Sequence, residues 1–111
     1  TDRDVVVYRL SGAFFFGTAS TVGAVLDRIA DERKAFVIDV SAVPFIDSTA
    51  ANVIAGIGRK AARHGIRVFV TGATPAMRQA LLRAGARRPH VRYLPQIEDA
   101  VREAHAFAKQ A

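Results

Sequence analysis

The chain has 111 residues, 50% of them hydrophobic and 23% charged, which suits one domain with a continuous core, and we expect no second domain. It contains no cysteine, which excludes thiol nucleophiles, thiolate metal sites and redox chemistry by the protein itself. The formal net charge of +6 favours anionic neighbours without choosing among them.

Two features of the sequence bear on whether this chain is part of a longer polypeptide and whether it crosses a membrane. It begins with Thr1, and its single methionine is Met77, so we expect it to be a piece of a longer polypeptide. No apolar run approaches the roughly 18 to 20 residues that a membrane span needs, and no charged-then-apolar leader precedes Val5. We therefore expect this piece to be soluble by itself.

The first third of the chain predicts two strands and a helix. Residues 5–10 (VVVYRL) form the first strand, and Ser11 and Gly12 then turn the chain before the aromatic run at residues 14–16. The simplest geometry is an antiparallel hairpin with a buried second strand, and the alternative is an exposed aromatic contact for a partner. From Thr18 the apolar residues recur at helical spacing, as Val22, Val25, Leu26 and Ile29.

The centre of the chain joins a strand, a polar turn and a helix without a gap. Residues 35–40 (AFVIDV) predict a strand buried on both faces. A helix is expected to begin at or near Asp47, because apolar residues then recur at helical spacing and an Asp there can accept hydrogen bonds from first-turn amides. Ser48 and Thr49 would be hydroxyls at this helix N-terminus. Asp47 is interpreted as an N-cap, with a regulatory phosphosite at Thr49 as the sharper alternative.

The remaining elements have clear end signals. Gly65 stands where a left-handed C-terminal cap belongs, and residues 67–71 predict the next strand. Thr74 and Pro75 begin another helix, with Met77, Leu81 and Ala84 facing inward and Gly85 ending it. Residues 91–94 form a short candidate strand, and a last helix begins at Ile97.

The elements thus follow in the order strand, strand, helix, strand, helix, strand, helix, strand, helix. Such alternation predicts an α/β fold with a mainly parallel central sheet of about five strands, about four helices and right-handed crossovers. The initial hairpin would add an antiparallel strand. We expect residues 1–111 to form a single domain.

The sequence predicts no enzyme. The histidines are widely separated and lack ligand-like spacing, so we expect neither a metal site nor a catalytic group among His64, His90 and His105. Asp39 follows a central strand, as the phosphoacceptor of a signal-receiver domain does, but the acidic residues that such a site needs after the first strand are missing. There is no GxxxxGK[ST] loop, and Gly56-Ile57-Gly58 lies inside a helical pattern, where it favours close packing.

Basic residues gather near the ends of two predicted helices. The first cluster is Arg59, Lys60, Arg63, His64 and Arg67, and the second is Arg83, Arg87, Arg88, His90 and Arg92. A solvated face that offsets the helix dipoles is the ordinary interpretation, and contact with an anionic membrane surface is the next. We expect no nucleic-acid partner, because aromatic residues are not interleaved with the basic ones.

Three segments carry a family resemblance: GAFFFGTAS at residues 12–20, VIDVSAVPFIDSTAANVI at residues 37–54 and HGIRVFVTG at residues 64–72. In this order and spacing they resemble the STAS domain of SulP-type (sulfate permease family) anion transporters, over nearly the whole chain. The most specific piece is VPFIDSTA after a buried strand. The FFFGTA segment points to the transporter branch over the related free-standing anti-sigma factor antagonists.

The resemblance implies a STAS-like, non-catalytic regulatory domain on the cytoplasmic face of the cell membrane. Its parent would move sulfate, bicarbonate, carboxylates or similar anions. The implied partners are the transmembrane part of the same transporter, a second copy in a homodimer, or a cytosolic regulatory protein. No cofactor is implied beyond weak binding of a nucleotide such as GTP or ATP, for which Ser48 and Thr49 are the candidate contacts.

The anti-sigma factor antagonists imply the alternative function. In them a serine two places after the motif's aspartate is phosphorylated by the partner kinase, and the matching position here is Thr49. Threonine replaces that serine, and Ala50 stands where glycine is usual. These departures leave Asp47 and Ser48 as the better-supported recognition turn, with a switch at Thr49 as the alternative.

Overall fold

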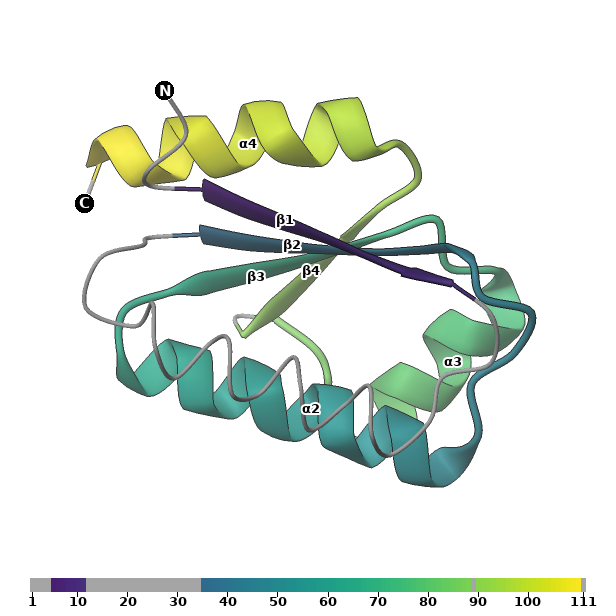
Figure 1. Cartoon of the computed structure of the whole chain (residues 1–111). Coiled ribbons are helices and arrows are strands. Elements are labelled where there is room, and N and C mark those ends of the chain that lie inside the picture. The colour runs from purple at the N-terminus through teal and green to yellow at the C-terminus, as the bar shows by residue number, and fades with distance from the viewer. Residues whose placement is uncertain (1–4, 12–34, 89, 111) are drawn as a thin grey trace.

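The structure is a computed structural model that describes residues 5–11, 35–88 and 90–110 (Figure 1). Its elements are β1 (Val5–Ser11), β2 (Ala35–Ala42), α2 (Ser48–Arg63), β3 (Arg67–Thr71), α3 (Pro75–Arg83), β4 (Val91–Leu94) and α4 (Ile97–Gln110). The predicted second strand at residues 14–16, its hairpin with the first strand, and the helix from Thr18 lie outside the described residues.

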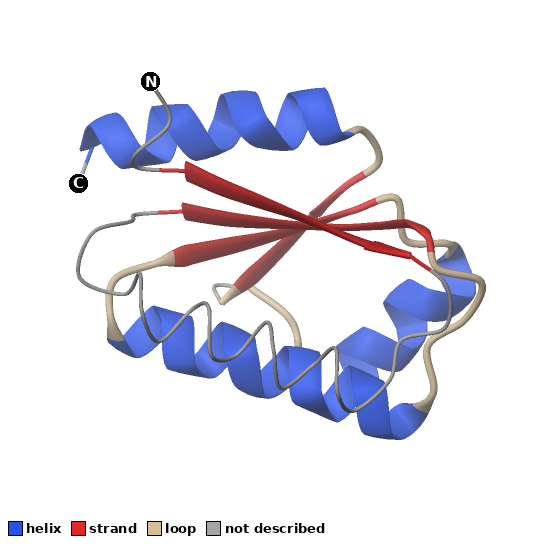
Figure 2. Ribbon diagram, viewed as in Figure 1, coloured by secondary structure: helices blue, strands red, loops and turns tan. Residues whose placement is uncertain are grey.

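The described strands form one parallel sheet in the order β1-β2-β3-β4. The α/β class and the parallel sheet are therefore confirmed, with four strands described where about five were predicted and three helices where about four were predicted. Because each crossover moves one place in the same direction, α2 and α3 lie on the same face of the sheet. Figure 2 shows these two helices on one side and α4 on the other.

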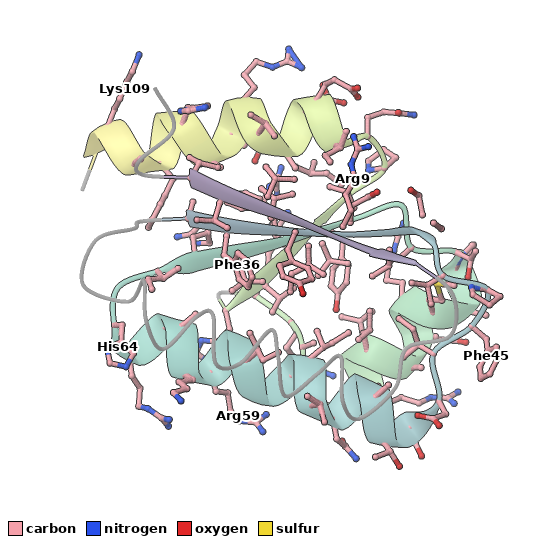
Figure 3. The ribbon with its side chains drawn as sticks, in the orientation of Figure 1. Arg9, Phe36, Phe45, Arg59, His64 and Lys109 are labelled. Atoms are coloured by element: carbon pink, nitrogen blue, oxygen red, sulfur yellow. The ribbon has the colours of Figure 1, made fainter. Side chains whose placement is uncertain are left out.

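β2 is buried on both faces, as its apolar run predicted. All six residues from 35 to 40 are buried, including Asp39 at 8% exposure. Phe36 and Ile38 belong to the larger core under α2 and α3, while Ala35 and Val37 belong to the smaller core under α4. One strand therefore joins the two layers of the core, and Figure 3 shows Phe36 on the side of the sheet that faces α2.

The predicted end signals of the helices are also confirmed. Thr74 caps α3 by accepting a hydrogen bond from the Met77 amide at 3.2 Å, and Pro75 occupies the first helical position. Gly65 follows α2 with φ of +74°, a left-handed conformation that glycine adopts without strain. These signals are local in the sequence, so they position both helices without reference to the rest of the fold.

A glycine inside α2 allows the close packing that the sequence suggested. Gly58 is buried, and a Cβ atom added there would lie 2.7 Å from Cγ2 of Val91 in β4. Gly56, two positions earlier, would place a Cβ in ordinary contact with Arg59 and with no other described side chain. Gly58 therefore sets how closely α2 approaches the edge of the sheet.

Candidate functional site

The candidate site is the turn that joins β2 to α2. Two buried side chains, Val43 at 4% exposure and Ile46 at 8%, fix this turn to the core. Between them Phe45 is 58% exposed, whereas phenylalanine is among the residues most often buried. Figure 3 shows Phe45 at the end of the molecule where α2 begins. The turn thus combines a fixed backbone with an exposed aromatic ring.

Asp47 closes the first turn of α2, as the sequence predicted. Its backbone is extended, with φ of −82° and ψ of 175°, and its Oδ1 atom accepts a hydrogen bond from the Ala50 amide at 2.8 Å. Its carbonyl oxygen accepts from the Ala51 amide at 2.9 Å. The side chain of Asp47 therefore satisfies one of the amides that a helix leaves unpaired at its start.

Ser48 and Thr49 follow in the first turn, and both are exposed. The first turn of α2 contains no acidic residue, so among residues 47–51 only Asp47 carries a negative charge. The amides and the dipole of a helix of 16 residues make this end of α2 favourable for negative charge. The three predicted site residues are thus adjacent and accessible on one surface.

A shallow hollow of about 210 Å³ lies between the start of α2 and the end of α3. Its lining residues are Ser48, Asn52, Ala80, Arg83 and Ala84. Ser48 therefore shares a hollow with the guanidinium-bearing Arg83, whereas Thr49 does not line it. The sequence prediction missed this pair, since it assigned Arg83 to a separate basic cluster at the end of another helix.

Asp39 is held inside the sheet by hydroxyl groups. Its Oδ2 atom accepts from the Ser41 hydroxyl at 2.8 Å, and its Oδ1 atom accepts from the Thr71 hydroxyl at 2.8 Å. Thr71 is its register partner in β3 and is fully buried. Asp39 therefore satisfies its buried carboxylate by joining two neighbouring strands.

The histidines of the described ranges lie on separate parts of the fold. His64 caps the end of α2, His90 precedes β4, and His105 lies on α4. Within these ranges no three His, Asp or Glu side chains are close enough together to hold a metal ion. None of the helices described in the structure has the length and apolar character needed to cross a membrane.

The basic residues of the two predicted clusters lie in two kinds of surroundings, solvent and the contacts between elements. Arg59 and His64 point away from the sheet on the outer side of α2 (Figure 3). Arg67 instead stacks over the ring of Phe107 in α4, with 4.5 Å between its guanidinium carbon and the ring centroid. Arg92, of the second cluster, is paired with Glu103 of α4 at 2.6 Å. The clusters are therefore partly solvated faces and partly links between β3, β4 and α4.

Comparison with known proteins identifies the fold family. The STAS domain model matches residues 1–104. The STAS domain of a SulP transporter from Vibrio cholerae has 27% sequence identity, with a TM-score of 0.79 over 98% of this chain and 87% of that chain. A search of curated proteins gave no match.

Two more distant structures share the fold. The anti-sigma factor antagonist SpoIIAA in its unphosphorylated form is 17% identical, with a TM-score of 0.74 over 96% of this chain and 93% of that chain. The murine Slc26a9 anion transporter is also 17% identical, with a TM-score of 0.74 over 94% of this chain but only 18% of the transporter chain. The fold thus occurs both in a chain of similar length and as a part of a much longer anion transporter. With its family match over nearly all residues, this chain belongs to the STAS domain family.

Proposed function

We propose that this STAS domain is a non-catalytic regulatory domain of a SulP-type anion transporter, placed on the cytoplasmic face of the cell membrane. The observation that carries the proposal is the similarity to the Vibrio cholerae SulP transporter domain over almost the whole of both chains. The net charge of +6 supports it, because a domain close to an anionic inner leaflet gains from lysines and arginines.

The domain acts through the turn before α2. Phe45 offers an aromatic ring that is 58% exposed, and the polar groups of Asp47, Ser48 and Thr49 lie directly after it. Exposed aromatic side chains with adjacent polar groups are typical of the centres of protein interfaces. The partner at this surface is the transmembrane part of the same transporter.

Site-specific crosslinking tests this assignment. A photoreactive phenylalanine analogue replaces Phe45 in the native polypeptide, and the crosslinked peptides are identified by mass spectrometry. We expect crosslinks to loops of the membrane-embedded part of the transporter. The same analogue at Lys109, near the end of α4, is the control and should not give those crosslinks. Crosslinks to a second copy of the domain, or to a cytosolic protein, would instead identify a homodimer or a separate regulator.

The hollow beside Ser48 supports weak binding of an anion or a nucleotide. Ser48 offers a hydroxyl at a helix N-terminus and Arg83 offers a guanidinium, two groups that commonly bind phosphate oxygens. In a titration with GTP, the Arg83→Gln variant should bind more weakly than the wild type. The Arg63→Gln variant removes the same charge at the far end of α2 and should bind like the wild type. Equal binding by all three proteins would exclude this hollow as the contact.

The alternative function is that of a free-standing antagonist of an anti-sigma factor, switched by phosphorylation at Thr49. The observation that favours it is the exposed position of Thr49 in the first turn of α2, which a kinase can reach. Incubation with an anti-sigma factor kinase and ATP should then add one phosphate to the wild type and none to Thr49→Ala. An unchanged mass for the wild type would count against the switch.

A further inference from the structure

A second surface, distinct from the turn before α2, follows the outer strand of the described sheet. β4 pairs with β3 from Val91 to Leu94, and no other strand in the described ranges pairs with it. Side chains alternate along this strand. Val91 and Tyr93 pack on the side of α2 and α3, while Arg92 reaches Glu103 of α4 on the other side. An edge strand of this kind has backbone donors and acceptors that can pair with another chain.

A large hollow lies beside β4 on the α3 side. Its volume is about 590 Å³, and it is lined by Arg78, Leu82, Arg87, Arg88, Val91 and Tyr93. Three of these residues are arginines and the other three give the hollow an apolar floor. The floor is held in place, because the Tyr93 hydroxyl donates to the Ala86 carbonyl oxygen and Arg87 donates to the Leu82 carbonyl oxygen.

A second hollow, of about 380 Å³, is lined by residues of β3, β4 and α4 and by Arg88. It contains Arg67, Arg88, Arg92 and Glu103. The Glu103 carboxylate accepts two hydrogen bonds from Arg92, at 2.6 and 3.2 Å. These bonds hold the pKa of Glu103 below its usual range. The negative charge of the Glu103 carboxylate is therefore offset by the guanidinium of Arg92. Because Arg88 lines both hollows, they meet beside the start of β4.

Only some of the arginines of this surface are paired with other described groups of the domain. Over the described ranges, the side chains of Arg78 and Arg88 make no hydrogen bond and no ion pair, and both residues are exposed. Of the described residues that line the two hollows, Glu103 alone carries a carboxylate, and it is already paired with Arg92. The surface is therefore complementary to a partner that supplies several carboxylates.

We propose that the outer edge of β4, with the two hollows beside it, is a docking site for an extended acidic peptide segment of a partner protein. Successive side chains of an extended chain point to opposite sides. In a segment that pairs with β4, the carboxylates on one side of the chain would point toward Arg78 and Arg87. The carboxylates on the other side would point toward Arg88 and Arg92. The backbone of the segment would pair with the edge of β4 that no other described strand occupies, a common mode of peptide recognition.

Two synthetic peptides of identical composition test the geometry. In the first, four glutamates are consecutive, so that two of them face each side of an extended chain. In the second, four glutamates occupy alternate positions and all face the same side, with glutamines at the other positions of both peptides. The first peptide should bind the 111-residue chain more tightly, and it should protect the backbone amides of residues 92–94 from hydrogen exchange. Equal affinity of the two peptides, or protection at α2 instead of β4, would overturn the proposal.

Charge-removing variants test the residues. Arg88→Gln should weaken binding of the first peptide by about fivefold, because Arg88 lines both hollows, and Arg78→Gln should weaken it by a smaller factor. Arg63→Gln, in the last turn of α2, removes the same charge outside the surface and should leave the affinity unchanged. An equal loss in Arg63→Gln would mean that the attraction is a nonspecific effect of net charge.

Two further probes separate other sources of negative charge. Inorganic phosphate that displaces the first peptide at a similar affinity would mean that one hollow is a small-anion site. Vesicles with phosphatidylserine that bind through Arg78 and Arg88, together with no peptide binding, would assign the surface to the membrane. Either result would overturn the proposal, whereas failure of the turn before α2 to crosslink leaves this surface unaffected.

Discussion

Asp47 has two roles that a single substitution can separate. Its side chain caps α2 through the Ala50 amide, and its charge lies on the exposed surface beside Ser48. Loss of the cap in Asp47→Ala should cost about 1 kcal/mol of unfolding free energy, measured by urea denaturation. Binding to the membrane part should fall by more than this cost explains.

Asp47→Asn is the matched control for that prediction. Asparagine caps a helix about as well as aspartate, so the stability of this variant should stay close to that of the wild type while the charge is lost. If stability collapses in Asp47→Ala while partner binding survives, the turn is structural and the proposed recognition surface is wrong.

Tyr93 gives the domain a pH dependence in the alkaline range. Burial raises its pKa from 10.0 to about 12, with Arg78 acting weakly in the opposite direction. The unfolded chain therefore loses the phenol proton at a lower pH than the folded protein. Stability from this group is complete below pH 10 and is lost as the pH rises toward about 12.

The Tyr93→Phe variant tests this dependence. It should lose about 1 kcal/mol near neutral pH, because the hydrogen bond to Ala86 is removed. Its unfolding free energy should then fall less steeply than that of the wild type between pH 10 and about 12. Parallel curves for the two proteins in urea titrations would contradict the assignment.

At the scale of single residues, the sequence predicted those features that depend on near neighbours. The caps at Asp47 and Thr74 and the left-handed Gly65 follow from residues a few positions away. The placement of Ser48 and Arg83 beside one hollow depends on α2 and α3 lying side by side, which follows from the order of the strands in the sheet. The periodicity of the sequence does not contain that order.

At the scale of elements, the same substitution at two glycines of α2 should have opposite effects on stability. Among the described residues, a Cβ at position 56 would meet only the end of the Arg59 side chain, so Gly56→Ala should stabilise the domain by up to about 1 kcal/mol through helix propensity. Ala at position 58 would lie 2.7 Å from Val91, a stiff branched side chain in the core. Gly58→Ala should therefore destabilise the domain by about 1 to 3 kcal/mol.

Thermal unfolding of the two variants measures this contrast directly. The melting temperature should rise in Gly56→Ala and fall in Gly58→Ala, although both changes add one methyl group to the same helix. A rise in both would mean that α2 can move away from β4 without loss of packing. The sequence suggested close packing at this glycine pair, but only the position of Val91 distinguishes the two glycines.

The elements themselves were predicted where their patterns were strong. The apolar run of β2, the helical period of α2 and the cap of α3 each correspond to an element of the structure. The sequence pattern placed Asp39 directly after a central strand, whereas it lies buried inside β2 with hydroxyl partners from Ser41 and Thr71. A hydroxyl in the neighbouring strand gives no signal in the sequence around an aspartate.

At the scale of the whole molecule, the two surfaces are built from different parts of the fold. The turn before α2 lies at one end of the molecule (Figure 1). The start of β1 and the end of α4 lie together at the opposite end. The β4 surface is formed instead by the outer strand and the arginines around it. Under the two proposals, the domain would contact a membrane-embedded part at one surface and an acidic segment at another.

The most direct test of the transporter assignment is to locate the native polypeptide that carries this domain. An antibody against the domain is used to probe membrane and soluble fractions of the native cells, and the detected polypeptide is identified by peptide mapping. We expect a membrane-fraction polypeptide much longer than 111 residues, with many apolar spans. A soluble polypeptide of about the length of this chain would contradict it, and Thr49 would then become the residue to examine.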